Sequence, residues 1–349
     1  MEAIKNTRFL RVIGIKSLYL NTLDNYQISP ESLSFPKTLM NEDMALIPSQ
    51  ALSLLYSELL KLSKDQDFVF NAYKDLNNIV EDPFDGWLFS CQDLSTLIWK
   101  LNNVINRIQT GAFLSIINLN KYSKWSYENP FIAPEVRSHD NIRALFVMIS
   151  ILRSHFDKSY KPLKIILPHS LLNIKKYEDY FGCKIEHSSS RVEVWIESSD
   201  YVKYNMDRKD KAFVTLRTKE LKTLLEIPSP DDQYSTFCEL INYCRYMGFP
   251  TLEMVANLLS VSEQALQRFC KKNGVSFSQI RGDVLSNISL YMLRNGDDIN
   301  SISKRLGYEQ TNSFNRMFKK HKGMTPKSYQ NEYIQYKNRL AFNILRTDK

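Results

Sequence analysis

Two groups of polar and basic residues in the last third of the chain have the residue types that bind duplex DNA. Glutamine, asparagine and arginine carry paired hydrogen-bond donors and acceptors that match base edges in the major groove. Lysine near the end of a helix suits phosphates, which position a protein without reading sequence. The first group is Gln264, Gln267, Arg268, Lys271 and Lys272, and the second is Gln310, Thr311, Asn312, Asn315, Arg316, Lys319 and Lys320. These groups predict recognition of DNA and not catalysis.

The two groups lie in the two copies of an internal repeat. A single basic amphipathic helix is most often only a solvated surface, but two matched copies favour a shared function. The copies are 47 residues apart in their first part and 48 in their second. The aligned pairs are Val255 with Ile302, Leu259 with Leu306, Leu266 with Phe314, Arg268 with Arg316, and Lys271-Lys272 with Lys319-Lys320.

Each copy has the pattern of a helix–turn–helix. In the first copy we expect a helix that begins after Thr251, a turn at Ser260-Val261, and a second helix over Glu263–Lys272 capped by Ser262. An earlier helix is expected to begin at Ser229 as N-cap, with Pro230 in its first position.

In the second copy, Asp298 is expected to cap a helix over residues 299–306, followed by a turn at Gly307-Tyr308 and a helix over 310–321. Lys304 and Arg305 lie on the first of these helices, where a helix that crosses the DNA backbone needs basic residues.

The charge distribution supports a polyanionic partner for the same region. The chain has 349 residues and a net charge of +8. Residues 1–240 carry 29 Lys/Arg and 30 Asp/Glu, a balance of −1, whereas residues 241–349 carry 17 and 8, a balance of +9. The positive excess is therefore confined to the repeat region, which argues against a uniformly basic, architectural DNA binder.

Residues 234–332 resemble the DNA-binding domain of AraC/XylS-type transcription regulators. The residues that carry the resemblance are Ile302, Leu306-Gly307-Tyr308, Phe314, Arg316, Phe318-Lys319-Lys320, Gly323, Thr325-Pro326 and Tyr329. Ser303 replaces the usual alanine and Gln330 the usual arginine, so we expect slightly looser helix packing.

The resemblance implies two helix–turn–helix units joined by a linking helix over residues 276–294. Their second helices would enter successive major-groove segments about 34 Å apart. By family position, the residues expected to face bases are Gln264, Gln267, Arg268, Gln310, Thr311, Asn312 and Arg316. Arg316 is alternatively a phosphate contact.

The first two-thirds of the chain mixes helix and strand patterns. We expect helices over residues 48–63, 93–110 and 141–153, and strands over 112–119, 164–167 and 191–196. Residues 166–196 resemble the arabinose-binding-like regulatory domain of a subset of these regulators, which implies effector sensing or dimerisation without naming arabinose. The predicted organisation is an α+β domain over 1–206, a linker over 207–233, an all-α DNA-binding domain over 234–332 and a tail over 333–349.

No pattern in the sequence indicates an enzyme, a cofactor or a metal. The chain has no Gly-rich phosphate loop and no GxSxG element. Its five cysteines form no CxxC pair, which predicts neither a disulfide framework nor a zinc site. His169 and His187 would approach one another if their strands pair, although an ordinary structural role is favoured. The four tryptophans are expected in the core, or alternatively in an effector pocket.

The sequence therefore predicts a cytoplasmic, nucleoid-associated bacterial transcription regulator, which is either an activator or a repressor. Its expected partners are promoter DNA, RNA polymerase, a small-molecule effector and a second copy of the chain, with no membrane partner. One alternative is a metabolite-binding or enzymatic N-terminal domain tethered to DNA. The other is an architectural DNA binder.

Overall fold

The computed structural model describes residues 1–76, 87–89, 91–188, 190–204 and 225–347. The chain divides into two compact units: an α/β unit, Asn6–Ile227, and a helical unit, Met1–Lys5 together with Pro228–Lys349. The chain therefore passes between the units twice, at residues 5–6 and 227–228. The expected linker lies largely outside the described residues.

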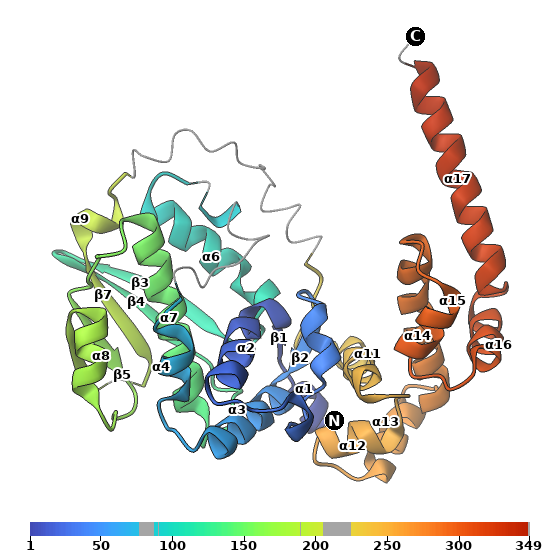
Figure 1. Cartoon of the computed structure of the whole chain (residues 1–349), viewed down its shortest axis with the longest axis horizontal. Coiled ribbons are helices and arrows are strands. Elements are labelled where there is room, and N and C mark those ends of the chain that lie inside the picture. The colour runs from blue at the N-terminus through green and yellow to red at the C-terminus, as the bar shows by residue number, and fades with distance from the viewer. Residues whose placement is uncertain (77–86, 90, 189, 205–224, 348–349) are drawn as a thin grey trace. The chain divides into compact units, whose positions relative to one another are not determined.

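The α/β unit is built on a five-stranded sheet (Figure 1). Its strands, in spatial order, are β3 (Phe113–Leu119), β4 (Tyr122–Glu128), β7 (Val192–Glu197), β5 (Lys164–Leu167) and β6 (Lys184–His187). Neighbours are antiparallel except β5 and β6, which run parallel. That parallel pair requires a crossover connection, which α8 (Ile174–Phe181) supplies.

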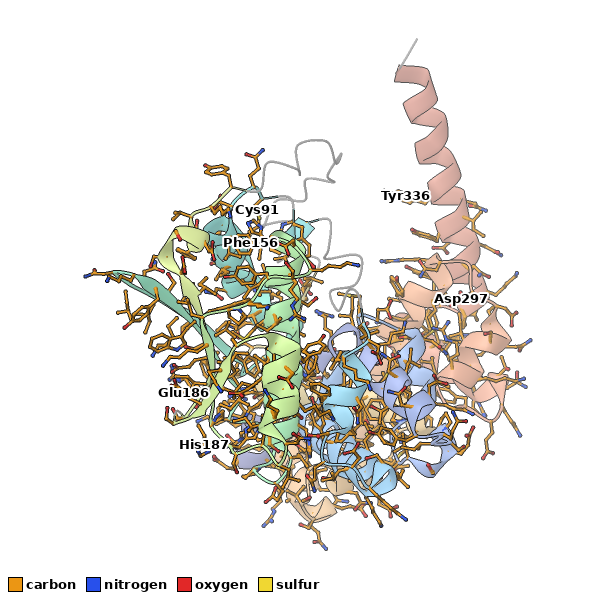
Figure 2. All side chains as sticks on the ribbon, turned by 60° about the vertical axis from the view of Figure 1, so that its left-hand side comes forward. Cys91, Phe156, Glu186, His187, Asp297 and Tyr336 are labelled. Carbon is orange, nitrogen blue, oxygen red and sulfur yellow. The ribbon has the colours of Figure 1, made fainter. Side chains whose placement is uncertain are left out.

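One face of the sheet forms part of the core, because alternate strand residues point to the same side. Val192, Val194 and Ile196 of β7 and Trp125 of β4 are completely buried. Helix α7 (Arg137–His155) packs against β4 and β7, and α8 packs against β6. Figure 2 shows Glu186 and His187 at the β6 edge, where Glu186 Oε2 accepts from Lys164 Nζ at 2.8 Å.

A second layer of helices and a small sheet complete the α/β unit. Strands β1 (Phe9–Arg11) and β2 (Leu46–Pro48) pair antiparallel. The remaining elements are η1 (Val12–Gly14), α2 (Lys16–Asn25), η2 (Pro30–Ser32), η3 (Lys37–Asn41), α3 (Ser49–Ser63), α4 (Phe68–Tyr73), α6 (Leu94–Ile108) and α9 (Ser198–Tyr201).

The helical unit contains two hydrophobic cores joined by one long helix (Figure 1). Helix α14 (Phe277–Arg294) places Ile280 and Val284 in the first core and Leu285 and Leu293 in the second. The other elements are α1 (Glu2–Lys5), α11 (Gln233–Cys244), η5 (Arg245–Met247), α12 (Leu252–Leu258), α13 (Glu263–Lys272), α15 (Ile299–Arg305), α16 (Thr311–Lys322) and α17 (Pro326–Thr347). No helix in the described residues is long and apolar enough to cross a membrane.

The predicted fold class is confirmed: the first region is mixed α/β, and the C-terminal region is all-helical. Two local expectations are wrong. The helix expected at Ser229 begins at Gln233, because Asp232 and not Ser229 accepts the capping hydrogen bond, from Ser235 N at 2.9 Å. Trp99 is 59% exposed and lies outside the core.

Candidate nucleic-acid interface

Helix α13 presents the first group of predicted DNA-binding residues to solvent. The Ser262 side chain caps the helix by accepting from Ala265 N at 3.3 Å. Leu266, Phe269 and Cys270 form its buried face, since they recur at helical spacing. The exposed residues are Gln264, Gln267, Arg268, Lys271 and Lys272.

Helix α16 has the same division between an apolar and a polar face. Phe314 and Phe318 are completely buried in the second core. Gln310, the N-cap residue, and the helix residues Asn312, Arg316, Lys319 and Lys320 are exposed. Seven basic residues thus project from the second helices of the two copies, counting Arg268, Lys271, Lys272, Arg316, Lys319, Lys320 and the half-buried Lys322.

Two of the predicted DNA-binding residues are less exposed than the others. Thr311 is half-buried, and its hydroxyl donates to Asn300 Oδ1 at 2.9 Å across the turn of the motif. Asn315 is also half-buried, and its side-chain oxygen has no hydrogen-bond partner among the described residues. Thr311 therefore serves the packing of the motif as well as its surface.

Lys304 and Arg305 are exposed on α15, the first helix of the second motif. Arg305 Nη1 lies 2.7 Å from Asp297 Oδ2, so its guanidinium is already in an ion pair at the start of that motif. A DNA phosphate would have to share this guanidinium with Asp297. Asp297 is labelled in Figure 2.

The orientation of α16 is fixed by side chains that the sequence analysis did not identify. His321 Nδ1 lies 2.7 Å from Asp283 Oδ1, and Lys322 Nζ donates to Asn287 Oδ1 at 2.5 Å, both partners being on α14. A Cβ atom at Gly282 would lie 2.1 Å from His321 Nε2. A glycine inside a predicted helix is the signal that could have pointed to this close approach.

The two motifs are also joined directly. A Cβ atom at Gly307, in the turn of the second motif, would lie 2.3 Å from the backbone nitrogen of Phe249, which precedes the first motif. The Phe249 and Tyr308 rings lie 4.9 Å apart, and the Arg281 guanidinium lies 4.3 Å from the Phe249 ring. Burial raises the pKa of Tyr308 to about 12, so its hydroxyl stays neutral at this contact. Together with α14, these contacts fix the relative orientation of the two motifs.

Residues 255–332 match the family model described as a helix–turn–helix domain. They form an AraC-type helix–turn–helix domain. Two curated relatives are similar to the chain. The transcriptional activator AggR of Escherichia coli is 34% identical over 80 residues, which are 23% of this chain and 30% of AggR. The ornithine utilization regulator of Pseudomonas aeruginosa is 25% identical over 157 residues, 44% of this chain and 46% of that protein.

The chain spans from about a quarter to under half of the length of the curated relatives it matches. A crystal structure of the transcriptional regulator CdpR from Pseudomonas aeruginosa aligns with this chain at 14% sequence identity and a TM-score of 0.34. The alignment covers 90% of this chain and 98% of the CdpR chain. The family model thus covers residues 255–332 of the helical unit and no residue of the α/β unit.

Proposed function

We propose that the protein is a sequence-specific, DNA-binding transcription regulator. The observation that carries this proposal is the repeated polarity of the AraC-type domain. Both second helices bury their apolar faces in cores that share α14, and both present glutamine or asparagine together with arginine and lysine to solvent. These residue types are suited to base edges and phosphates.

The site residues keep the roles expected from the sequence, except Thr311, which is half-buried and borders the base-reading residues. Gln264, Gln267, Arg268, Gln310, Asn312 and Arg316 read bases, Thr311 and Asn315 border them, and the remaining basic residues hold phosphates. The α/β unit senses an effector or self-associates, and it performs no catalysis. The partners are promoter DNA, RNA polymerase and a second copy of the chain, in a bacterial cytoplasm and on its nucleoid.

The test is selection of genomic fragments by the full chain, followed by anisotropy titrations of a selected fragment and a shuffled fragment of equal composition. We expect the selected fragment to bind at least about 10³-fold more tightly at physiological salt. Equal affinity for the two fragments would instead identify an architectural DNA binder. A substrate turned over by the α/β unit would identify a DNA-tethered enzyme.

A further inference from the structure

A small, partly open apolar cavity lies in the α/β unit, where α6 and α7 meet the segment that contains β1 and η1. Its volume is about 120 Å³. The walls are mainly aliphatic, with Leu10, Ile13, Leu101, Ile105, Val147 and Ile151 among them. An engineered apolar cavity of about 150 Å³ binds benzene, so this space suits a molecule of about one ring.

One end of the cavity is polar and carries a buried arginine. Arg143 is 5% exposed, and its Nη2 lies 2.8 Å from Oδ1 of Asp140, which is completely buried. Nη2 also donates to Gln109 Oε1 at 3.1 Å, and Nε donates to Tyr56 OH at 3.1 Å. Gln109 and Arg143 both line the cavity.

One nitrogen of this guanidinium has spare donor capacity. Arginine carries two hydrogens on Nη1. Among the described residues, Nη1 has one acceptor, the carbonyl oxygen of Gly14, at 3.3 Å. Gly14 and Arg143 both line the cavity, so this hydrogen bond joins two residues of the cavity wall. A ligand oxygen there would meet a charged donor whose second hydrogen has no partner.

The charge balance of this polar end limits what the cavity accepts. Arg143 and Asp140 neutralise one another in a buried pair, and Asp140 also accepts from Tyr127 OH at 2.7 Å. Burial raises the pKa of both Tyr56 and Tyr127, so these hydroxyls stay neutral. A carboxylate or ammonium ligand would therefore add an uncompensated buried charge. An uncharged molecule would not.

We propose that this cavity is the effector site of the regulator. It takes a small, uncharged, mostly apolar molecule of about one ring, with one carbonyl or ether oxygen that accepts a hydrogen bond from Arg143 Nη1. The role as an effector site rests on the proposed function. The binding of such a molecule does not.

The cavity wall is continuous with the connections to the helical unit. Leu10, Ile13 and Gly14 follow the first chain crossing, at residues 5–6, within a few residues. In the same segment, Arg11 donates from Nε to Arg107 O at 2.7 Å on α6 and from Nη2 to Glu226 O at 2.8 Å. Glu226 directly precedes the second crossing. A ligand that displaces this wall would therefore act on both crossings at once.

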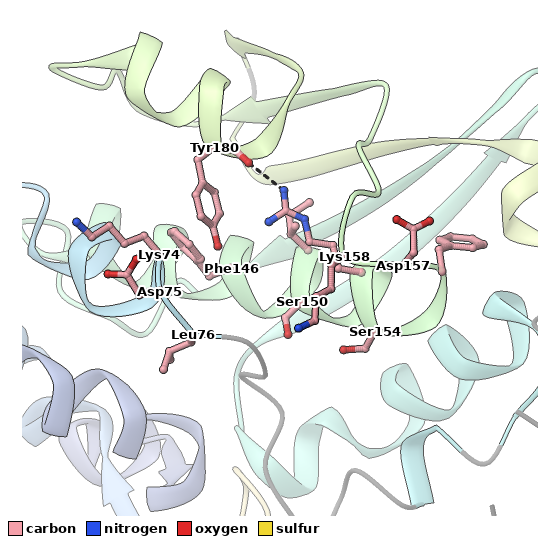
Figure 3. A pocket seen from close by; sticks show the side chains of 12 residues that line it. Lys74, Asp75, Leu76, Phe146, Ser150, Ser154, Asp157, Lys158 and Tyr180 are labelled. Atoms are coloured by element: carbon pink, nitrogen blue, oxygen red, sulfur yellow. Dashed lines mark hydrogen bonds between the residues drawn. The ribbon is translucent and has the colours of Figure 1, made fainter. Parts of the chain in front are cut away.

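A second, larger cavity is also lined by residues of α7, but several of its lining residues are charged. Its volume is about 480 Å³, and exposed Lys74, Asp75, Asp157 and Lys158 contribute to its lining (Figure 3). Arg153 in its wall donates to Tyr180 O at 2.9 Å. This site is suited to charged, hydrated molecules, and it provides the location control for the experiment.

The experiment measures binding of cyclohexanone to the full chain by ligand-observed NMR, with toluene, benzoate and cyclohexylammonium as comparison probes. Cyclohexanone should bind at least tenfold more tightly than toluene, which has no acceptor, and the two charged probes should not bind. Val147→Phe fills the cavity and should weaken cyclohexanone binding at least tenfold. Ile105→Phe fills the cavity from α6, and it replaces Val147→Phe in the measurement if that variant does not fold.

The matched control is Ser150→Phe, which adds the same ring to α7 on the side of the larger cavity. It should leave cyclohexanone binding unchanged. Absence of cyclohexanone binding, or binding lost in Ser150→Phe and kept in both filling variants, would overturn the assignment. Binding that leaves the affinity for a selected promoter fragment unchanged would overturn the effector role. Failure of the full chain to distinguish promoter from shuffled DNA would count against the proposed function and not against the cavity.

Discussion

At the scale of single residues, Arg268 and Lys320 are both exposed on second helices. We propose that they differ in what they recognise. A bidentate arginine contact to guanine distinguishes one base pair, whereas lysine contacts phosphate as a point charge. We expect Arg268→Ala to cost about 1–3 kcal/mol on the selected site and to relax specificity at one base pair. Anisotropy titrations on sites substituted one base pair at a time would locate that position.

Lys320→Ala is the matched comparison for that measurement. It should weaken binding to selected and shuffled DNA alike and reduce the salt slope of log K by about 1, since one fewer phosphate is neutralised. If both variants lose the same affinity on both DNAs, the division between base-reading and phosphate-holding residues is wrong.

Ser303 is a buried polar residue where the family usually has alanine. It is 1% exposed, and its hydroxyl has no hydrogen-bond partner among the described residues. An unsatisfied buried hydroxyl costs free energy, so Ser303→Ala should raise the unfolding free energy by about 1 kcal/mol. Urea denaturation of the two proteins measures the difference.

Ser289→Ala provides a control for this gain in stability. Ser289 is also completely buried, but its hydroxyl donates to Leu285 O at 2.8 Å. Ser289→Ala should therefore give no increase in the unfolding free energy. An equal gain from both substitutions would mean that the missing hydrogen bond of Ser303 is not the cause.

Two histidines of the α/β unit, the buried His139 and the half-buried His169, predict a loss of stability in acid. Burial lowers the pKa of His139 and of His169 to about 4, from an ordinary value near 6.5. The folded state resists protonation that the unfolded state accepts, so stability is highest above pH 6.5 and falls progressively between pH 6.5 and 4. Urea midpoints across this range test the trend. His169→Gln should make the loss of stability with falling pH shallower. An unchanged slope would contradict the attribution of this loss to His169.

At the scale of elements, the turns of the two motifs have the same left-handed backbone but different residues. Ser260 has φ of 53° and the equivalent Gly307 has φ of 80°. Gly307→Ala should destabilise the helical unit by more than the ~1–2 kcal/mol of left-handed strain, because its Cβ would clash with the Phe249 backbone. Ser260→Gly should be nearly neutral. Thermal unfolding of both variants tests this, and a tolerated Gly307→Ala would exclude a rigid contact between the motifs.

The local chemistry of these elements was predictable from the sequence. Thr251, Ser262 and Asp298 cap the predicted helices, because capping depends on residues within one turn. The second helix of the first copy has the bounds expected for it, Glu263–Lys272. The amphipathic repeat also predicted which face of α13 and α16 is buried, since both cores form from neighbouring helices.

What the sequence could not supply depends on contacts between distant segments. Strand β4 was missed because alternating serine and aromatic residues become a strand only beside β3 and β7. The His321–Asp283 pair joins residues 38 positions apart, and it is one of the contacts that orient α16. The spacing of Asp140 and Arg143 on α7 alone would indicate an exposed i, i+3 ion pair. The pair is buried because α3 and β4 supply further partners, and the sequence does not show these contacts.

At the scale of the whole molecule, the first residues of the chain belong to the helical unit. Ile4 is completely buried in the first core, together with Phe237, Leu240 and Ile241. The N-terminal ammonium of Met1 donates to Gln233 Oε1 at the start of α11. The helical unit is therefore assembled from both ends of the chain, with the α/β unit inserted between them.

This insertion predicts that a substitution at the N-terminus weakens a domain more than 220 residues away in sequence. Ile4→Ala should cost about 2–4 kcal/mol in the first core, and Ile4→Val about 1 kcal/mol, because the buried volume removed is smaller. Hydrogen exchange on the full chain measures both, as faster exchange of α11 and α12 amides in the order Ala, Val, native, with α7 unchanged. The faster exchange should be accompanied by a lower affinity for promoter DNA, since α13 packs on the same core. If exchange in α11 and α12 is unaltered by Ile4→Ala, the N-terminal segment does not belong to the DNA-binding fold.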